Sequence, residues 1–187
     1  MSTAHIGCRQ GDGMVVAQGF RVVGDNRVRE SIGLCLDEVT VGMVIEHRPA
    51  VTITDGLHAM WLQLTGNPAP VHSDQRYCER VGRDQPLVCG IVTLGIVSTA
   101  SVRSISALTT ANLGMNDACW TGAVHVGDTL RAQSEILHAR PSRSRPDHGV
   151  LTVRTTGFNQ RDAQVITFTR TFLIPADAAA FRAATDY

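Results

Sequence analysis

The sequence predicts an α+β fold in which a curled antiparallel sheet wraps around one long buried helix. Three observations support this class. Residues 88–104 are apolar or small apart from a single charge, Arg103. Residues 109–175 carry the alternation of apolar and polar positions that is typical of strands. One strand and two shorter helical segments come before the apolar stretch, so helices and most strands are segregated along the chain, as in α+β folds.

The apolar stretch 88–104 is interpreted as a core helix. A helix that is apolar on every side has to be buried on every side, and its small residues, among them Gly90 and Gly95, let neighbouring backbone approach closely. At about 1.5 Å per residue the stretch is roughly 25 Å long, which is short for a bilayer that needs roughly 20 residues. Its flanks look like ordinary globular chain, so we expect no membrane span.

The rest of the chain divides into an extension, a domain and a tail. Residues 1–28 are weakly periodic and are expected to form an N-terminal extension of uncertain order, with one strand and a turn at residues 24–26. A single domain is expected over residues 29–176, and its first clear strand is the alternating, β-branched segment 39–54. Residues 177–187 are expected to form a tail that is a short surface helix or is frayed.

A helix is predicted over residues 55–66. Thr54 or Asp55 can cap its N-terminus, and Gly66 is a typical residue at a helix C-terminus. Its apolar positions share one face at helical spacing: Leu57, Trp61 and Leu64. Two prolines stiffen the loop that follows, and a short helix is predicted over residues 74–82.

Strands dominate the chain after the apolar helix. Five segments have the turn-bounded patterns of strands: 109–115, 119–126, 129–140, 149–160 and 163–175. The third alternates strictly, and the last two read as a hairpin. A meander of this kind after one apolar helix suggests the hot-dog arrangement, a curled sheet around a helix.

Composition excludes several classes of function. The length of 187 residues suits one domain, and the net charge of zero gives no electrostatic footprint for nucleic acid or an anionic membrane. All 17 basic residues are Arg, so Schiff-base and P-loop chemistry, which need Lys, are excluded. The five Cys form no metal-type spacing with His, so we expect no metal site and reduced thiols in a cytoplasmic protein.

The loop and its flanks carry a motif. The segment Thr65-Gly66-Asn67-Pro68-Ala69-Pro70-Val71-His72-Ser73-Asp74 resembles the hydratase signature of the MaoC-like dehydratases and (R)-specific enoyl-CoA hydratases. Further segments match this family, and the last three look most like its mesaconyl-CoA hydratase branch: 87–90, 126–130, 142–146, 111–114 and 153–160. The resemblance covers roughly residues 38–175.

This resemblance implies a single hot-dog domain that adds water reversibly to a 2-enoyl thioester. The product would be a 3-hydroxyacyl thioester, and the substrate a short, branched or dicarboxylic acyl-CoA of the mesaconyl kind. Coenzyme A would enter as part of the substrate, and no other cofactor is implied. One departure stands out: the family signature has Asp where this chain has Asn67, and an amide cannot accept a proton as a carboxylate does.

The resemblance also suggests roles for individual residues. His72 would be the acid and base, and the N–H of Gly90 would bind the thioester oxygen at the positive end of a helix. Asn67 would position the water or the thioester; alternatively, it is only a residue that tolerates the left-handed conformation at a helix end. The other residues expected to contact the substrate are Val88, Cys89, Asp74, Arg143 and Arg145.

Alternatives remain open for three of these residues and for the function. Asp74 can instead cap the helix that follows it, and Arg143 and Arg145 bind CoA phosphates or belong to a solvated loop. A hot-dog thioesterase would need a carboxylate near the thioester, for which Asp74 or Asp55 is the candidate. The missing Asp also favours a non-catalytic protein that binds acyl thioesters.

The expected partners follow from the same resemblance. They are a thioester on CoA or on a carrier protein and a second copy of the chain, since exposed sheet edges pair readily.

Overall fold

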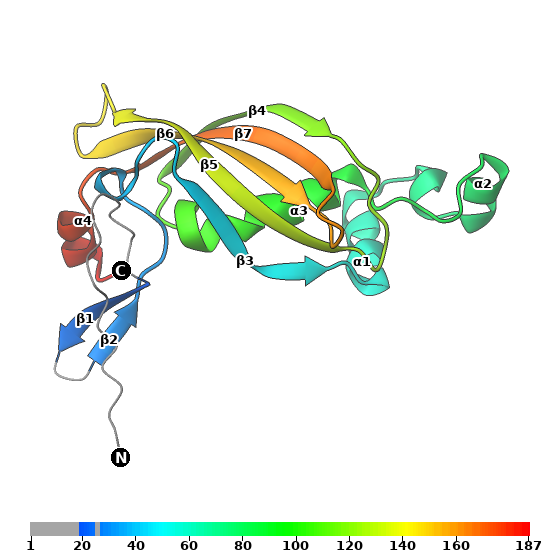
Figure 1. Ribbon diagram of the computed structural model, residues 1–187, viewed down its shortest axis with the longest axis horizontal. Coiled ribbons are helices and arrows are strands. Elements are labelled where there is room, and N and C mark those ends of the chain that lie inside the picture. Colours follow the sequence, from blue (N-terminus) through cyan, green and yellow to red (C-terminus); the bar gives the residue numbers. More distant parts are fainter. Residues whose placement is uncertain (1–18, 25–26) are drawn as a thin grey trace, which may run out of the picture.

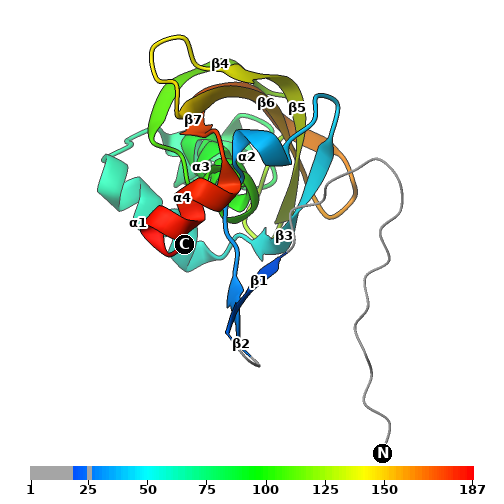
Figure 2. The ribbon, with the colours of Figure 1, turned by 90° about the vertical axis from the view of Figure 1, so that its left-hand side faces the viewer.

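A five-stranded antiparallel sheet curls around the helix α3 (Gly90–Ala100) in the computed structural model, which describes residues 19–24 and 27–187 (Figures 1 and 2). The strand order is β3-β5-β6-β7-β4. The strands are β3 (Val44–Thr52), β4 (Ala111–Trp120), β5 (Thr129–Pro141), β6 (His148–Phe158) and β7 (Gln164–Pro175). The predicted α+β class with a curled sheet around one helix is therefore confirmed.

Strand β5 shows why these segments form a sheet with one buried face. Its residues alternate between buried and partly exposed, with Leu130, Ala132, Ser134 and Ile136 turned inward. An alternation of period two puts one set of side chains on the concave face that packs on α3. Strand β7 lies two strands away and buries Phe168 on the same face.

Helix α3 is shorter and less enclosed than the sequence predicts. It begins at Gly90, ends at Ala100 and continues as a π-helical turn, η3 (Val102–Ser106). Burial on all sides is wrong for this single chain, because Ile91 is 49% and Val102 40% exposed. One side of an apolar helix therefore stays open to solvent.

The segments before α3 form the predicted helices with adjusted ends. Helix α1 (Asp55–Thr65) is capped by the Thr54 side chain and ends at Gly66, whose φ of 60° is left-handed. The expected apolar face is partly wrong, because Leu64 is 76% exposed while His58 is buried. Its neighbours are η2 (Pro70–His72) and α2 (Gln75–Arg80).

The region after α3 differs from the prediction in its strand count. One strand, β4, replaces the expected pair 109–115 and 119–126, and the chain after Trp120 runs as a loop to β5. The pairing of β4 with β7 is irregular between Asn116 and Cys119, where Asp117 has a φ of 54°. This bulge interrupts the alternation, so the sequence reads as two strands.

Both ends of the described chain lie at one end of the sheet (Figure 1). Strands β1 (Phe20–Gly24) and β2 (Arg27–Glu30) form a hairpin, while the first 18 residues of the predicted extension lie outside the described residues. The tail forms α4 (Ala178–Thr185), held by two hydrogen bonds of 2.7 and 2.9 Å from Arg182 to Glu38 of η1 (Leu36–Glu38).

Two further observations concern helix length and thiols. None of the helices in the part of the chain that the structure describes is long and apolar enough to cross a membrane. The described cysteines are free thiols: Cys35, Cys78, Cys89 and Cys119.

Candidate active site

Three histidines hold the segment 86–89, which leads into the N-terminus of α3. His125 bonds to the carbonyl of Pro86 at 3.0 Å, His72 bonds to the carbonyl of Leu87 at 2.9 Å, and His58 bonds to the N–H of Cys89 at 3.3 Å. The three histidines come from different parts of the chain: helix α1, the 3-10 helix η2, and the loop between β4 and β5. The helix terminus is thus fixed from several sides.

His72 is held in one tautomer when neutral. Its Nδ1 lies 2.9 Å from the carbonyl oxygen of Leu87, and a carbonyl only accepts, so Nδ1 carries the proton. The lone pair is then on Nε2, which makes no hydrogen bond within the described residues. Pro70 at the start of η2 fixes the backbone before it. The half-buried ring therefore presents a free basic nitrogen.

His58 is a neutral support rather than a second base. Its Nε2 accepts from the N–H of Cys89, so its proton sits on Nδ1. Burial, and next the charge that His72 would carry, lower the pKa of His58 below its usual 6.5. The two rings lie edge to face with centroids 6.5 Å apart.

Asn67 is oriented by contacts on both ends of its amide. Its Oδ1 accepts from the N–H of Ala69 at 3.0 Å, and its Nδ2 donates to Sγ of Cys89 at 3.3 Å. The amide thus bridges the loop before His72 and the residue before α3. A carboxylate at this position could accept the first bond but could not donate the second.

Gly90 is the first residue of α3, and the N–H groups of Gly90 and Ile91 have no acceptor among the described residues. Such N–H groups at the positive end of a helix suit an oxyanion. The Gly90 carbonyl accepts from Nε1 of Trp120 at 2.9 Å, and a Cβ on Gly90 would lie 2.8 Å from that same nitrogen. A glycine is therefore required for Trp120 to pack here.

The structure brings together some of the predicted site residues and not others. Asn67, His72, Cys89 and Gly90 meet at the helix terminus through the contacts described above. Val88 is 5% exposed, and its N–H bonds to the Val124 carbonyl, so its side chain belongs to the apolar core. Its role in binding substrate stays a prediction.

The remaining predicted contacts lie apart from the helix terminus. Asp74 caps α2 by accepting from the N–H of Tyr77 at 3.0 Å. Arg143 and Arg145 are exposed in the turn between β5 and β6, at the opposite end of the sheet from α2 (Figure 1). Within one chain these arginines do not reach the site.

His58 and His125 were not identified from the sequence. His58 lies one position after Leu57 on the apolar side of α1, where a histidine resembles an ordinary core residue. His125 precedes a buried carboxylate, Asp128, which accepts from its backbone N–H at 2.9 Å and from Gln160 at 2.7 Å. No spacing rule links either histidine to the helix terminus.

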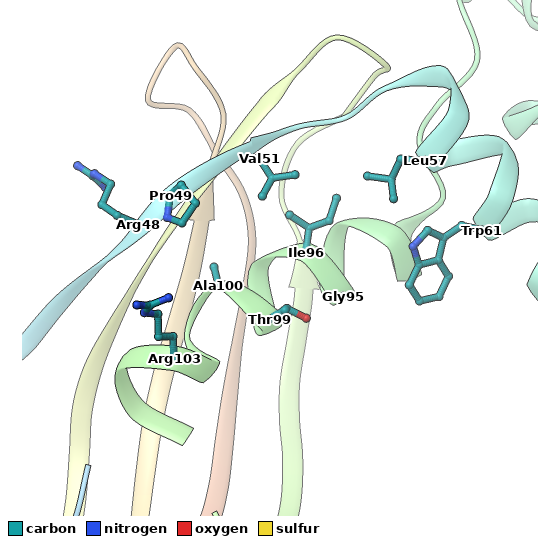
Figure 3. Close-up of a pocket in the computed structure, with 10 residues that line it drawn as sticks. All are labelled: Arg48, Pro49, Val51, Leu57, Trp61, Gly95, Ile96, Thr99, Ala100 and Arg103. Atoms are coloured by element: carbon teal, nitrogen blue, oxygen red, sulfur yellow. The ribbon is translucent and has the colours of Figure 1, made fainter. Parts of the chain in front are cut away.

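An apolar cavity of about 370 Å³ lies between α1, α3 and β3 (Figure 3). Leu57 and Trp61 lie at one end, while Arg48 and Arg103 stand at the other end. A pocket of this size with few polar groups is typical of small-molecule sites.

A comparison of the sequence with models of known protein families shows which proteins the chain resembles. The family model described as mesaconyl-CoA hydratase matches residues 15–186. The chain belongs to the mesaconyl-CoA hydratase family.

Two curated relatives of the chain have enzyme names that relate to this family. A mesaconyl-CoA hydratase of Cereibacter sphaeroides is 26% identical over 147 residues, which cover 79% of this chain and 43% of the relative. A beta-methylmalyl-CoA dehydratase of Chloroflexus aurantiacus is 27% identical over 142 residues, covering 76% and 40%. The chain thus spans less than half the length of these relatives.

Solved structures confirm the hot-dog fold expected for the mesaconyl-CoA hydratase family. A MaoC domain dehydratase of Chloroflexus aurantiacus superposes with a TM-score of 0.74 and 26% identity over 76% of this chain and 40% of its own. A Mycobacterium tuberculosis protein with a double hot-dog fold gives 0.69 and 26%, covering 78% and 45%. A MaoC-like dehydratase of Rhodospirillum rubrum gives 0.68 at 22% identity, covering 78% and 99%.

Proposed function

We propose that this chain adds and removes water at a 2-enoyl thioester, interconverting it with a 3-hydroxyacyl thioester. The observation that carries the proposal is the free Nε2 of His72, whose ring is bonded to the carbonyl of Leu87, three residues before the unpaired N–H groups that open α3. A base and an oxyanion site are the two elements that conjugate addition of water requires. The family membership supports a short, branched or dicarboxylic acyl-CoA as the substrate.

The proposed reaction uses one histidine twice. His72 Nε2 takes a proton from water while the oxygen forms a bond to C3, and the double-bond electrons move toward the thioester. The N–H groups of Gly90 and Ile91 stabilise the resulting enolate oxygen. The same Nε2 then returns the proton to C2, so atoms and charge balance without a second base. Asn67, which keeps one N–H unused by Cys89, would orient the water.

His58 supports the segment before α3 only while its ring is neutral. Protonation of His58 would remove the acceptor for the Cys89 N–H and place a second cation beside His72. Its lowered pKa therefore favours a neutral ring throughout the cycle.

We further propose that a second hot-dog unit pairs along β4 and that no cofactor is required besides the CoA of the substrate. Strand β4 is an open edge that carries Leu113, Met115 and Trp120, each at least 42% exposed. An edge of this kind is a template for pairing. The chain covers less than half of its curated relatives, which leaves room for a second unit, and a second copy of this chain is the simplest candidate.

The apolar cavity suggests a revised site for the CoA phosphates. Arg48 and Arg103 stand at one end of it, where they pair with the carboxylates of Glu46 and Glu30 and would exchange these partners for phosphate, whereas Arg143 and Arg145 lie at the far end of the sheet. Pantetheine could then follow the apolar lining toward His58. Arg143 and Arg145 remain candidates only if they belong to the site of a second unit.

The test is hydration of crotonyl-CoA and mesaconyl-CoA by the purified protein, followed by loss of enoyl absorbance and by product mass. His72→Gln should lower kcat by about 10²–10⁴-fold, the usual contribution of general acid–base catalysis. His138→Gln, on the exposed side of β5, is the matched control and should leave kcat unchanged. Equal rates for both variants would refute the role of His72.

Two other outcomes would favour one of the alternative functions, a thioesterase or a non-catalytic binding protein. Release of free CoA without hydration would indicate a thioesterase. Tight binding without turnover, restored to turnover by Asn67→Asp, would indicate that the chain is a non-catalytic binding protein because it lacks the carboxylate.

A further inference from the structure

A layer of buried polar side chains crosses the concave face of the sheet. Four strands each contribute one residue: His47 of β3, Ser134 of β5, Thr155 of β6 and Arg170 of β7. His47 Nε2 lies 2.8 Å from Ser134 Oγ, which lies 2.8 Å from Thr155 Oγ1. The layer divides the apolar core into two clusters, one with Phe168 and one with Phe172.

Arg170 is the charged member of this layer and lacks an anionic partner. It is 7% exposed, and no carboxylate of the described residues forms an ion pair with it. One terminal nitrogen lies 3.4 Å from Ser98 Oγ, the other bonds to Ser101 Oγ, and the buried Nε has no partner in the part of the chain that the structure describes. Buried charges are normally paired, because an uncompensated charge away from water is costly.

The surroundings of Arg170 do not supply the missing anion. The nearest ionisable group of the layer, His47, is kept neutral by burial and by the charge of Arg170, which lower its pKa to about 4. Ser98 and Ser101 are neutral, and the Phe172 ring lies 5.5 Å from the guanidinium. An anion has to come from outside the described chain.

The contacts of Arg170 place it about 12 Å along α3 from the N–H groups proposed to bind the thioester oxygen. On α3, Ser98 lies eight residues beyond Gly90, about 12 Å along the axis. On β7, four residues separate Arg170 from Ile166, which is about 13 Å, and Ile166 pairs with Trp120, which bonds to Gly90.

Two exposed residues flank the buried guanidinium in the single chain. Met115, opposite Arg170 on β4, is 42% exposed, and Val102, just beyond Ser101, is 40% exposed. A ligand that approaches between α3 and β4 reaches Arg170 if the second unit proposed to pair along β4 leaves the side of this strand that faces α3 uncovered.

We propose that Arg170, held by Ser98 and Ser101, binds the free carboxylate at the far end of a dicarboxylic acyl thioester. This inference rests on the proposed function, because it takes the thioester oxygen to lie at Gly90. A carboxylate would supply both the missing charge and an acceptor for the unpaired Nε. The separation of about 12 Å favours a medium-chain dicarboxylic group, which is longer than the short acyl group that family membership supports.

The test measures binding of saturated thioesters, which cannot be hydrated. Decanoyl-CoA is compared with its ω-carboxylated counterpart, and butyryl-CoA with succinyl-CoA, by calorimetric titration. The wild type should prefer the carboxylated member of the medium-chain pair by roughly ten- to a hundredfold, the range for a hydrogen bond between charged groups. Arg170→Met should reduce that ratio to about one, and Arg170→Lys, which keeps the charge but loses the fork, should retain part of it.

Arg154→Met is the matched control, since Arg154 is an exposed arginine on β6 that pairs with Glu135. It should leave the ratio unchanged. The inference is overturned if the wild type shows no preference in either pair, if it binds neither member, or if Arg170→Met alters only the oligomeric state. Hydration of crotonyl-CoA, which has no free carboxylate, tests the proposed function separately. If Arg170→Met still hydrates it, the proposed function stands whether or not the binding ratio supports the carboxylate site.

Discussion

The buried histidine of β3 should make the stability of this protein depend on pH. His47 is 1% exposed, and both ring nitrogens are bonded, Nδ1 to Ser104 Oγ at 2.7 Å and Nε2 to Ser134 Oγ at 2.8 Å. Burial, and then the charge of Arg170, lower the pKa of His47 from 6.5 to about 4. His47 therefore binds a proton less readily in the folded state than in the unfolded chain.

The sign and size of the effect follow from this difference. Between pH 6.5 and pH 4 the unfolded state binds more protons than the folded state, so the free energy of unfolding falls as pH falls. The contribution of His47 is fully present above pH 6.5 and is lost on descending to about pH 4. A shift of this size corresponds to about 3 kcal/mol in total, with about 2 kcal/mol lost by pH 5.

Denaturation with urea at pH 8, 6.5 and 5 measures this contribution. The wild type should lose about 2 kcal/mol more than His47→Gln between the highest and lowest pH, because the variant has no ring to protonate. His58 also has a lowered pKa, so only the difference between the two proteins is informative. His138→Gln, at an exposed position, should follow the wild type. Parallel curves for wild type and His47→Gln would refute the reasoning.

Three further changes have expected outcomes. Gly90→Ala should displace the Trp120 indole, since the new Cβ would lie 2.8 Å from its Nε1, and should shift tryptophan emission while lowering hydration. Glu38→Gln should weaken the anchor of α4, seen as faster amide exchange in that helix with unchanged exchange in the sheet. Arg48→Gln combined with Arg103→Gln should raise KM several-fold for an acyl-CoA but not for the matching acyl-pantetheine; equal KM changes would contradict a phosphate role.

The fold was largely predictable because its signals are local. The alternation in 129–140 fixes which side chains of β5 face inward, and that strand matches the prediction to within a residue or two. Helix α3 was overestimated in length because Ser101, Val102 and Ser104 continue its small and apolar character into the π-helical turn. The bulge at Asp117 could not be read from the sequence, since it depends on pairing with β7.

The polar layer under α3 escaped sequence analysis for a different reason. Its members fit the strand pattern individually: Ser134 and Thr155 are small, and Arg170 sits between Phe168 and Phe172 as a polar residue in an apolar run. Only the pairing of four strands brings them together, in a diagonal line: Ser134 is opposite Thr155, whereas His47 and Arg170 are each displaced by two residues from the neighbour in the line. A property that arises from long-range pairing is invisible to spacing rules.

The candidate site shows the same division between local and distant signals. His72 could be found because a proline-stiffened loop and a motif surround it, whereas His58 reads as one more residue on the inner side of α1. What makes them a site is the segment before α3, whose carbonyl and N–H groups leave each ring only one arrangement of donor and acceptor. Those bonds assign the free base to His72 and the neutral support to His58. In the proposed mechanism these roles are set by backbone groups rather than by a carboxylate, and Asn67, at the place where the family signature has Asp, keeps its own two hydrogen bonds to Ala69 and Cys89.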